Sequence, residues 1–324
     1  MKNWFSDRQL TFLIAMNVAI VLLATAFSDG LFIDIDNLQS MGGQVSELGI
    51  LSIAVMLAMI SGSGGIDLSV VALANLSGVI AGLVVPHILS PDDAPLAFTL
   101  GFVALALVVG ALGGLINGLL VTKMTIPPFI ATLGLMMSVR GINMVMTDGR
   151  AIYFADYPTF KMLAQGRLFD VLPYPVFYLV VVALIAAYIL KKTVIGRYVY
   201  AVGSNEVAAH LSGIKVQRVK IFVYAFCGLL TGIAGVILAS RLNSGQPTVG
   251  VGYELEAIAA VVIGGTSLMG GIGTIGGTII GAFIMSVLKN GLNLMGVSQF
   301  WQMVAMGVVV IAAVYLDTLR KKIR

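Results

Sequence analysis

A carboxylate lies in a short polar stretch between two apolar runs of the sequence. The stretch is SGSGGIDLSV, residues 61–70, and Asp67 is its one ionisable group. A carboxylate in apolar surroundings is costly, so Asp67 is expected to pair, to cap the helix that follows, or to meet a solvent path. The surrounding glycines and serines favour a break in helical structure. A structural cap and a role in solute passage or gating both stay open for Asp67.

Other polar side chains interrupt apolar runs at helical spacing. Arg140 and Asn143 are three residues apart, and Lys289 and Asn293 are four apart, so each pair is expected on one helical face. Such groups could hydrogen-bond a polyhydroxylated solute, or they could tie helices together at about 0.6 kcal/mol each. The candidate translocation residues are Asp67, Asn75, Arg140, Asn143, Lys289, Asn290 and Asn293.

Motifs for catalysis and for metal or nucleotide binding do not occur in the sequence. G-x-x-x-x-G-K-[ST] for phosphate, H-E-x-x-H for zinc and the G-x-S-x-G nucleophile elbow are all missing. Cys227 is the one cysteine, and His87 and His210 lie far apart. We therefore expect no metal, no cofactor and no enzymatic activity on this chain. If ATP hydrolysis powers transport by this chain, the ATPase must be another chain.

Composition indicates the solvent in which these residues must work. Of 324 residues, 59% are hydrophobic and 10% charged, and the mean hydropathy is +1.01. Soluble domains are about 45–50% apolar and about 25% charged, so we expect an all-α polytopic membrane protein that forms one domain over residues 1–324. A span takes roughly 20 apolar residues. The ten expected spans are 10–27, 47–60, 69–86, 96–121, 127–146, 174–190, 219–240, 255–270, 272–295 and 300–317.

Basic residues indicate the orientation of these spans. With the N-terminus in the cytoplasm, thirteen of the nineteen Lys and Arg residues fall in cytoplasmic segments, whereas the opposite loops collect aspartates. The positive-inside rule therefore predicts that both ends of the chain are cytoplasmic. The net charge of +4 is read as this topological signal and not as a nucleic-acid site.

Glycines recur in a pattern that predicts close helix packing. The spacing G-x-x-G-G-x-x-x-G starts at Gly110 and again at Gly273, 163 residues later. Small residues at such spacing let helix backbones touch. Because the first copy is expected to run inward and the second outward, an inverted repeat typical of transporters is favoured, with two unrelated packing helices as the alternative. The packing positions are Gly110, Gly114, Gly118, Gly273, Gly277 and Gly281.

Two loops are long enough to carry function. The outer loop, residues 147–173, mixes charges and aromatics and is either a structured surface or a plain connector. The cytoplasmic loop, residues 191–218, contains a short helical pattern with Ser204 or Asn205 as N-cap. A capped helix there is a candidate docking element. Its other residues are Glu206 in the first turn, the small Ala208 and Ala209, and Gly213 as the stop.

Four motifs in order resemble one family over nearly the whole chain. They are SGGIDLSV at 63–70, PPFIATLGLM with RGI within 127–142, IGRYVYAVGSNEVAAHLSGI at 195–214, and GGTSLMGGIGTIGGTIIGA with NGLNLMGVSQFWQ within 264–302. The sequence resembles the membrane permease subunit of bacterial ATP-binding-cassette sugar importers, the group of the ribose, xylose, arabinose, galactose and autoinducer-2 permeases.

The resemblance implies a high-affinity importer in the bacterial inner membrane. The glycine-packed helices, the break at Asp67 and the cytoplasmic docking segment favour alternating access as its mechanism. A periplasmic binding protein would deliver the sugar, two permease copies would form the path, and two ATP-binding-cassette subunits, which hold ATP and Mg²⁺, would drive it. The coupling residues that it implies are Gly196, Arg197, Gly203, Asn205, Glu206, Ala208, Ala209 and Gly213. The alternative within this class is an ABC permease for a nucleoside, polyol or amino acid. The alternative from another class of transporter is an ion-coupled secondary carrier.

Overall fold

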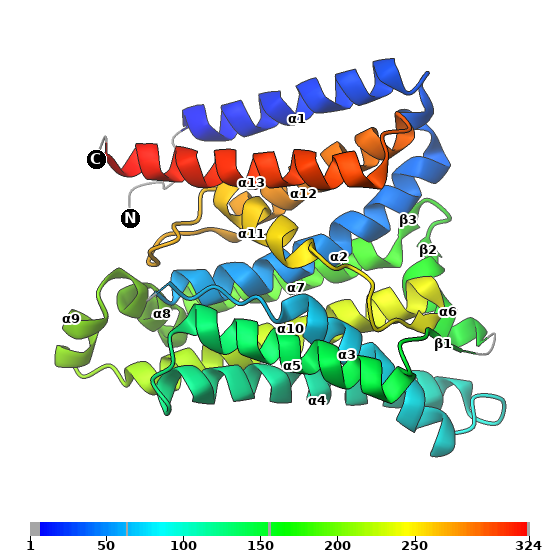
Figure 1. Cartoon of the computed structure of the whole chain (residues 1–324), viewed down its shortest axis with the longest axis horizontal. Helices are drawn as coiled ribbons and strands as arrows, with labels where there is room; N and C mark the ends of the chain where they lie inside the picture. The colour runs from blue at the N-terminus through cyan, green and yellow to red at the C-terminus, as the bar shows by residue number, and fades with distance from the viewer. Residues whose placement is uncertain (1–6, 63, 155–156, 323–324) are drawn as a thin grey trace.

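The computed structural model describes residues 7–62, 64–154 and 157–322, and they form a bundle of helices. Figure 1 shows α8 and α9 at one end of the bundle and α6 with the short strands at the other. The helices are α1 Asp7–Phe27, α2 Ile35–Ile60, α3 Val70–Val84, α4 Pro95–Thr122, α5 Pro128–Thr147, α6 Pro158–Gln165, α7 Tyr174–Lys192, α8 Val194–Ser204, α9 Glu206–Leu211, α10 Val216–Leu242, α11 Tyr253–Ile263, α12 Ile275–Leu294 and α13 Gln299–Lys322.

Short elements complete the chain. The 3₁₀ turns are η1 Leu31–Ile33 and η2 Val85–His87. The strands, each of two residues, are β1 Ile152–Tyr153, β2 Arg167–Leu168, β3 Leu172–Pro173 and β4 Ser244–Gly245. β1 pairs with β4 and β2 with β3, both antiparallel. They tie loops together and leave the fold class all-α, as predicted.

Seven helical segments in the described part of the chain are long and apolar enough to cross a membrane, which confirms a polytopic membrane protein. They are Ile35–Ile60, Val70–His87, Pro95–Thr122, Pro128–Thr147, Tyr174–Lys192, Val216–Leu242 and Ile275–Leu294. Shorter apolar stretches, Leu13–Phe27 and Gln299–Ala312, lie in α1 and α13. The count of ten and the cytoplasmic location of both ends stay predictions.

The span predicted at residues 255–270 is wrong in length. Its helix, α11, has 11 residues, which at 1.5 Å per residue is about 16 Å, roughly half of a 30 Å hydrocarbon core. The helix stops because Gly264 and Gly265 follow Ile263, and Gly265 has a φ of +90°, a conformation that side chains disfavour. α11 is therefore a short helix between two non-helical segments, 243–252 and 264–274.

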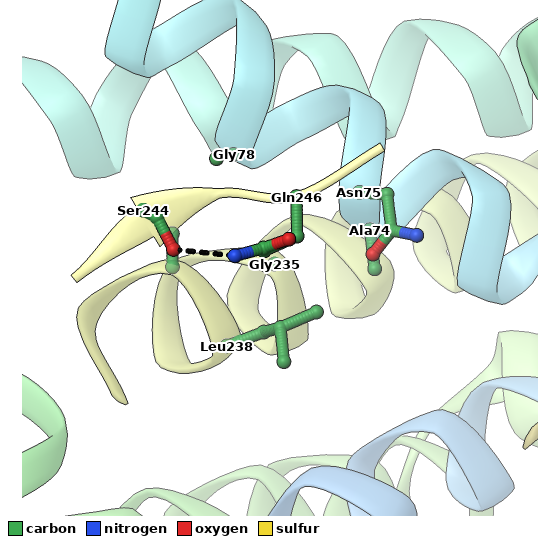
Figure 2. A pocket seen from close by; sticks show the side chains of 9 residues that line it. Ala74, Asn75, Gly78, Gly235, Leu238, Ser244 and Gln246 are labelled. Atoms are coloured by element: carbon green, nitrogen blue, oxygen red, sulfur yellow. Dashed lines mark hydrogen bonds between the residues drawn. The ribbon is translucent and has the colours of Figure 1, made fainter. Parts of the chain in front are cut away.

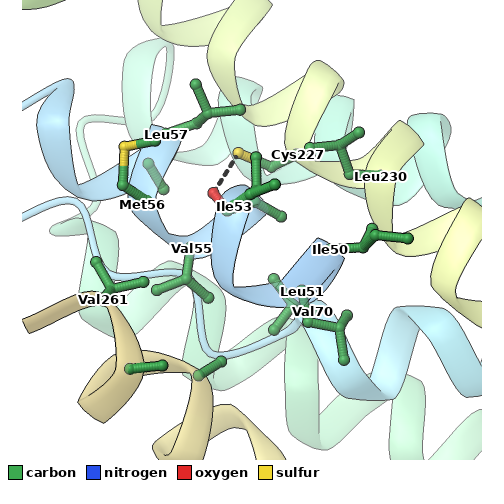
Figure 3. Close-up of a cluster of buried hydrophobic side chains, with 14 of the residues drawn as sticks. Ile50, Leu51, Ile53, Val55, Met56, Leu57, Val70, Cys227, Leu230 and Val261 are labelled. Atoms are coloured by element: carbon green, nitrogen blue, oxygen red, sulfur yellow. Dashed lines mark hydrogen bonds between the residues drawn. The ribbon is translucent and has the colours of Figure 1, made fainter. Parts of the chain in front are cut away.

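The centre of the bundle is α2. Every residue from Val45 to Ile60 is buried, because α7, α10, α11 and α12 all pack against this helix. Figure 3 shows its side chains against Leu230 and Cys227 of α10 on one flank and Val261 of α11 on another. α4, α5 and α7 lie further out and expose large apolar side chains, as expected where lipid is the solvent.

The two halves of the chain repeat one order of elements. A long helix, a non-helical segment, a short helix and two further helices make up α2 to α5 and again α10 to α13. α4 packs on α10, and α12 packs on α2. In Figure 1, α4 begins at the end with α6 and α12 begins at the end with α8, so they run in opposite directions. This arrangement favours the inverted repeat over two unrelated packing helices.

The glycine pattern is not in register with that repeat. α4 begins at residue 95 and α12 at residue 275, an offset of 180 rather than 163. Gly110 and Gly114 do pack α4 on α10, because a Cβ on either would overlap the backbone around Gly228, and Gly118 lies against Ile221. Gly277 and Gly281 instead pack α12 on α11, at Gly264 and Ala260. Gly273 precedes α12, so its assignment to a packing helix is wrong.

Residues of the loop predicted at 147–173 form a folded cap, whose described part packs on the bundle. Phe154, Tyr157 and Phe160 join Phe98 and Phe102 of α4 in an aromatic cluster. The hydroxyl of Ser240 in α10 donates to the Phe160 carbonyl at 2.7 Å. The structured alternative is thus favoured over a plain connector; that this cap faces outward stays a prediction.

Candidate functional site

Asp67 stabilises the turn that leads into α3. The side chain is buried, and its Oδ1 accepts from the backbone N–H of Ser69 at 2.9 Å and from the Ser69 hydroxyl at 2.6 Å. The amide of Asn117 in α4 donates to Ser69 Oγ at 2.8 Å. This is the geometry of an Asx turn held by a neighbouring helix, and of the two readings of Asp67 it favours the structural cap.

Asn75 and Asn143 are helix ties. Asn75 in α3 donates through Nδ2 to the Val249 carbonyl at 2.8 Å, which attaches the segment 243–252 to α3. Asn143 in α5 donates to the Ala72 carbonyl at 3.4 Å. Both side chains are buried. Asn75 also borders a narrow crevice, about 160 Å³ including its open mouth, where Gln246 Nε2 donates to Ser244 Oγ at 2.9 Å (Figure 2).

Arg140 and Lys289 converge on the first turn of α11. Arg140 Nη2 of α5 lies 2.8 Å from Glu254 Oε1, and Lys289 Nζ of α12 lies 2.8 Å from Glu256 Oε1. The Lys289 ammonium also stands 3.8 Å from the centre of the Tyr253 ring. The side chain of Glu254 is 8% exposed and that of Glu256 12%, so both carboxylates need these cations. The start of the short helix is therefore clamped from two sides by charge.

The remaining two predicted path residues lie elsewhere. Asn290 exchanges amide hydrogen bonds with Asn37 of α2, at 3.0 and 2.9 Å. Asn293, in the last turn of α12, is exposed. The seven candidates thus do not form one site: Asp67, Asn75 and Asn143 surround α3, Arg140 and Lys289 hold α11, and the two asparagines of α12 lie apart from both groups.

Sequence reasoning missed the partners of these cations. Glu254 lies one residue before the span predicted at 255–270, Glu256 lies inside that span, and Glu47 begins another. Arg241 Nη2 of α10 lies 2.8 Å from Glu47 Oε2, and the Glu47 side chain is 3% exposed. A glutamate within an apolar span is itself a signal, since intramembrane charges must pair. The identity of each partner was not available, because up to 194 residues separate the two members of a pair.

The predicted coupling segment is folded as two short capped helices. Thr193 Oγ1 accepts from Gly196 N at the start of α8, and Asn205 Oδ1 accepts from Ala208 N at the start of α9, at 2.9 Å. Glu206 pairs with Lys220 of α10 at 2.7 Å. Gly213 follows the end of α9 with a φ of +83°. The predicted Asn205 cap and Gly213 stop are thus seen in the structure; docking on an ATPase stays a prediction.

The coupling residues divide into an exposed and a buried set. Arg197 and Ala208 are exposed, and the apolar Val207 and Leu211 of α9 are 69% and 81% exposed. Ala209 is buried. Gly196 and Gly203 are buried as well, since each lies where a Cβ would overlap a neighbouring backbone. These two glycines attach α8 to the bundle and do not form part of a free docking surface.

Comparison with known proteins gives one consistent result. The family described as the permease component of a branched-chain amino acid transport system matches residues 37–314. The ribose import permease protein RbsC of Escherichia coli (strain K12) is 43% identical over 319 residues, covering 98% of this chain and 95% of that protein. RbsC of Bacillus subtilis (strain 168) is 44% identical over 309 residues, 95% of this chain and 92% of that one.

A third relative extends the group beyond ribose permeases. The L-arabinose transport system permease protein AraH of Escherichia coli (strain K12) is 36% identical over 304 residues, 94% of this chain and 89% of that one. No solved structure matches the chain. Because identity above 40% extends over almost the full length, the chain belongs to the family of ABC transporter permease components that includes the ribose and arabinose import permeases.

Proposed function

We propose that the chain is the membrane-spanning subunit of an ATP-driven importer that carries a monosaccharide across the bacterial inner membrane. The observation that carries this proposal is its full-length similarity to ribose import permeases. The fold supports it as well, because short helices and non-helical backbone lie inside the bundle, as transport proteins require. The chain would hold no cofactor of its own, and ATP and Mg²⁺ would bind to the partner ATPase.

α9 is the proposed contact with the ATP-binding-cassette subunit. It has only six residues, is held at its start by the Asn205 cap, and presents Val207 and Leu211 outward. Apolar side chains at such exposure on a polar loop favour burial against another protein. The Glu206–Lys220 ion pair attaches α9 to α10, so pressure on α9 would reach the long helix that packs on α2 and α4.

A second permease copy and a periplasmic binding protein complete the proposed assembly. The two copies would enclose the path and alternate between outward and inward access. The binding protein would supply most of the affinity for the sugar, so the path itself needs only weak contacts. We place delivery of the sugar by the binding protein at the folded cap formed by residues of 147–173.

Reconstitution in proteoliposomes tests the function. The chain, its ATPase and its binding protein are combined, and uptake of radiolabelled ribose, arabinose, xylose, galactose and leucine is measured with ATP inside and outside the vesicles. ATP-dependent uptake of a pentose or hexose is the expected result. Uptake of leucine alone would mean that the substrate is an amino acid and not a sugar. Accumulation without the ATPase, abolished by an ionophore, would instead identify an ion-coupled carrier.

The docking surface has its own test. Val207→Asp with Leu211→Asp should abolish co-purification of the ATPase, since two charges would then face an apolar contact. The permease itself should remain in the membrane with an unchanged melting temperature, because both side chains are exposed. Retention of the ATPase by this double variant would contradict the docking assignment.

A further inference from the structure

Three segments that are distant in the sequence meet backbone to backbone at the end of the bundle that carries α8 and α9. They are the last turn of α8, the end of α2, and the segment 264–274. A Cβ at Gly203 would overlap the Ile60 carbonyl oxygen, and a Cβ at Gly62 would come within 2.8 Å of the Gly203 Cα. A Cβ at Gly270 would lie 2.5 Å from the Gly62 Cα. We name Gly62, Gly203, Gly270 and Gly271 the glycine joint.

Hydrogen bonds fasten the joint. The backbone N–H of Gly271 donates to the Ile60 carbonyl at 3.1 Å, which links the segment 264–274 to α2. The Tyr200 hydroxyl donates to the Gly273 carbonyl at 2.8 Å, which links α8 to the same segment. Tyr200 is partly buried, and this burial raises the pKa of its hydroxyl, so the group is a donor at neutral pH. α8 is thereby bonded to one half of the repeat and pressed against the other.

Both partners of α8 in the joint belong to segments that connect two helices. Residues 61–69 connect α2 to α3, and residues 264–274 connect α11 to α12. Contacts between backbones have no side-chain rotamers that could absorb a displacement, so a close-packed contact passes a movement on. A shift of α8 therefore reaches the start of α3 and the start of α12 together.

We propose that the glycine joint, with Tyr200 as its positioning residue, is the point where movement of the ATPase-docking helices enters both halves of the permease at once. The exposed α9 receives the force and the buried end of α8 distributes it. This inference rests on the proposed function, because it concerns how ATP hydrolysis is linked to passage of the solute. Tyr200 acts through the backbone of Gly273 and touches neither solute nor nucleotide.

The decisive measurement is the number of solute molecules transported per ATP hydrolysed in proteoliposomes. Tyr200→Phe removes one hydrogen bond and leaves the ring in place. We expect this ratio to fall about fivefold, while membrane abundance and the amount of ATPase bound stay unchanged. The matched control is Tyr188→Phe, an exposed tyrosine on α7, which should leave the ratio as it is.

Gly203→Ala tests the backbone contact itself. The added methyl group must push α8 away from Ile60, so the ratio should fall about tenfold or more. Gly276→Ala is its control, since a Cβ there meets nothing within 4 Å. If Gly203→Ala fails to assemble, Tyr200→Phe decides the test.

An unchanged ratio in Tyr200→Phe would overturn the inference. This holds whether both rates stay at the unsubstituted value or whether transport and ATP hydrolysis fall in equal proportion, as a purely structural role would produce. Failure of the proposed function is distinguishable from this result, because the unsubstituted assembly would then show no ATP-dependent uptake at all.

Discussion

Two non-helical segments, 61–69 and 243–252, each precede a short helix, α3 and α11. They are stabilised by different kinds of contact. In 61–69, Asp67 and Ser69 bond to each other within the segment, and Asn117 adds a bond from α4. In 243–252, Gln246 bonds to Ser244 within the segment, but the other ties come from outside. There β4 pairs with β1, Asn75 of α3 holds the Val249 carbonyl, and Arg140 and Lys289 clamp the helix that follows. A break can thus be stabilised by its own side chains or by distant ones.

This difference explains for which segment the sequence alone indicated the bonding groups. Those of 61–69 lie two residues apart, so they appear as a compact motif. Those of the second segment are 174 and 114 residues away from their partners, so the sequence predicted only a connector between the spans 219–240 and 255–270. Substitutions that remove one bond at a time test this difference between the two segments.

Arg140→Leu should have the largest effect on stability. It leaves the buried carboxylate of Glu254 without its cation, which costs about 3 kcal/mol of the free energy of unfolding. Unfolding of the detergent-solubilised protein, followed by circular dichroism against denaturant, measures it. Arg140→Leu combined with Glu254→Leu should recover most of the loss, because no charge then stays unpaired.

The control for that experiment is Arg150→Leu, which removes an exposed arginine close by in the sequence. It should change the free energy of unfolding by less than about 0.5 kcal/mol. Equal losses for Arg140→Leu and Arg150→Leu would mean that charge does not hold α11, and the contrast between the two breaks would fail.

Asp67→Ala comes next, with a loss of about 2 kcal/mol, because the backbone N–H and the hydroxyl of Ser69 lose their acceptor in a buried place. Asp67→Asn keeps an acceptor oxygen, so it should lose less and retain transport. Unfolding and uptake are measured for both variants. Normal stability of Asp67→Asn with abolished uptake would contradict the structural cap and favour a role of the carboxylate in the path.

Asn75→Leu should have the smallest effect, about 1 kcal/mol, since it removes one neutral hydrogen bond. Limited proteolysis of the segment 243–252 should accelerate in this variant, because its tie to α3 is gone. Asn293→Leu is the matched control, as its amide is exposed. Faster cleavage in the control, or none in Asn75→Leu, would mean that Asn75 does not hold this segment.

Local patterns predicted a large part of this molecule. The apolar runs predicted most of the long helices, and Asn205 and Gly213 predicted the start and stop of α9. α11 was predicted too long. The apolar residues before Gly264 and the glycine-rich residues after it are similar in hydropathy, so the end of the helix was not visible in the sequence. The glycine pattern correctly indicated close packing at Gly110, yet its copy at Gly273 lies in a loop, since spacing alone does not say which backbone comes near.

What the sequence determines by itself is the class of solvent, the apolar helices and the capped local turns, because hydropathy and capping depend on neighbours within a few residues. Tertiary structure alone decided that Glu254 meets Arg140, that Gly203 meets Ile60, and that α8 touches both halves of the chain. Arg140 and Glu254 are 114 positions apart, and Tyr200 of α8 and Gly273 are 73 apart. Such contacts arise from how whole helices pack, and no local pattern encodes them.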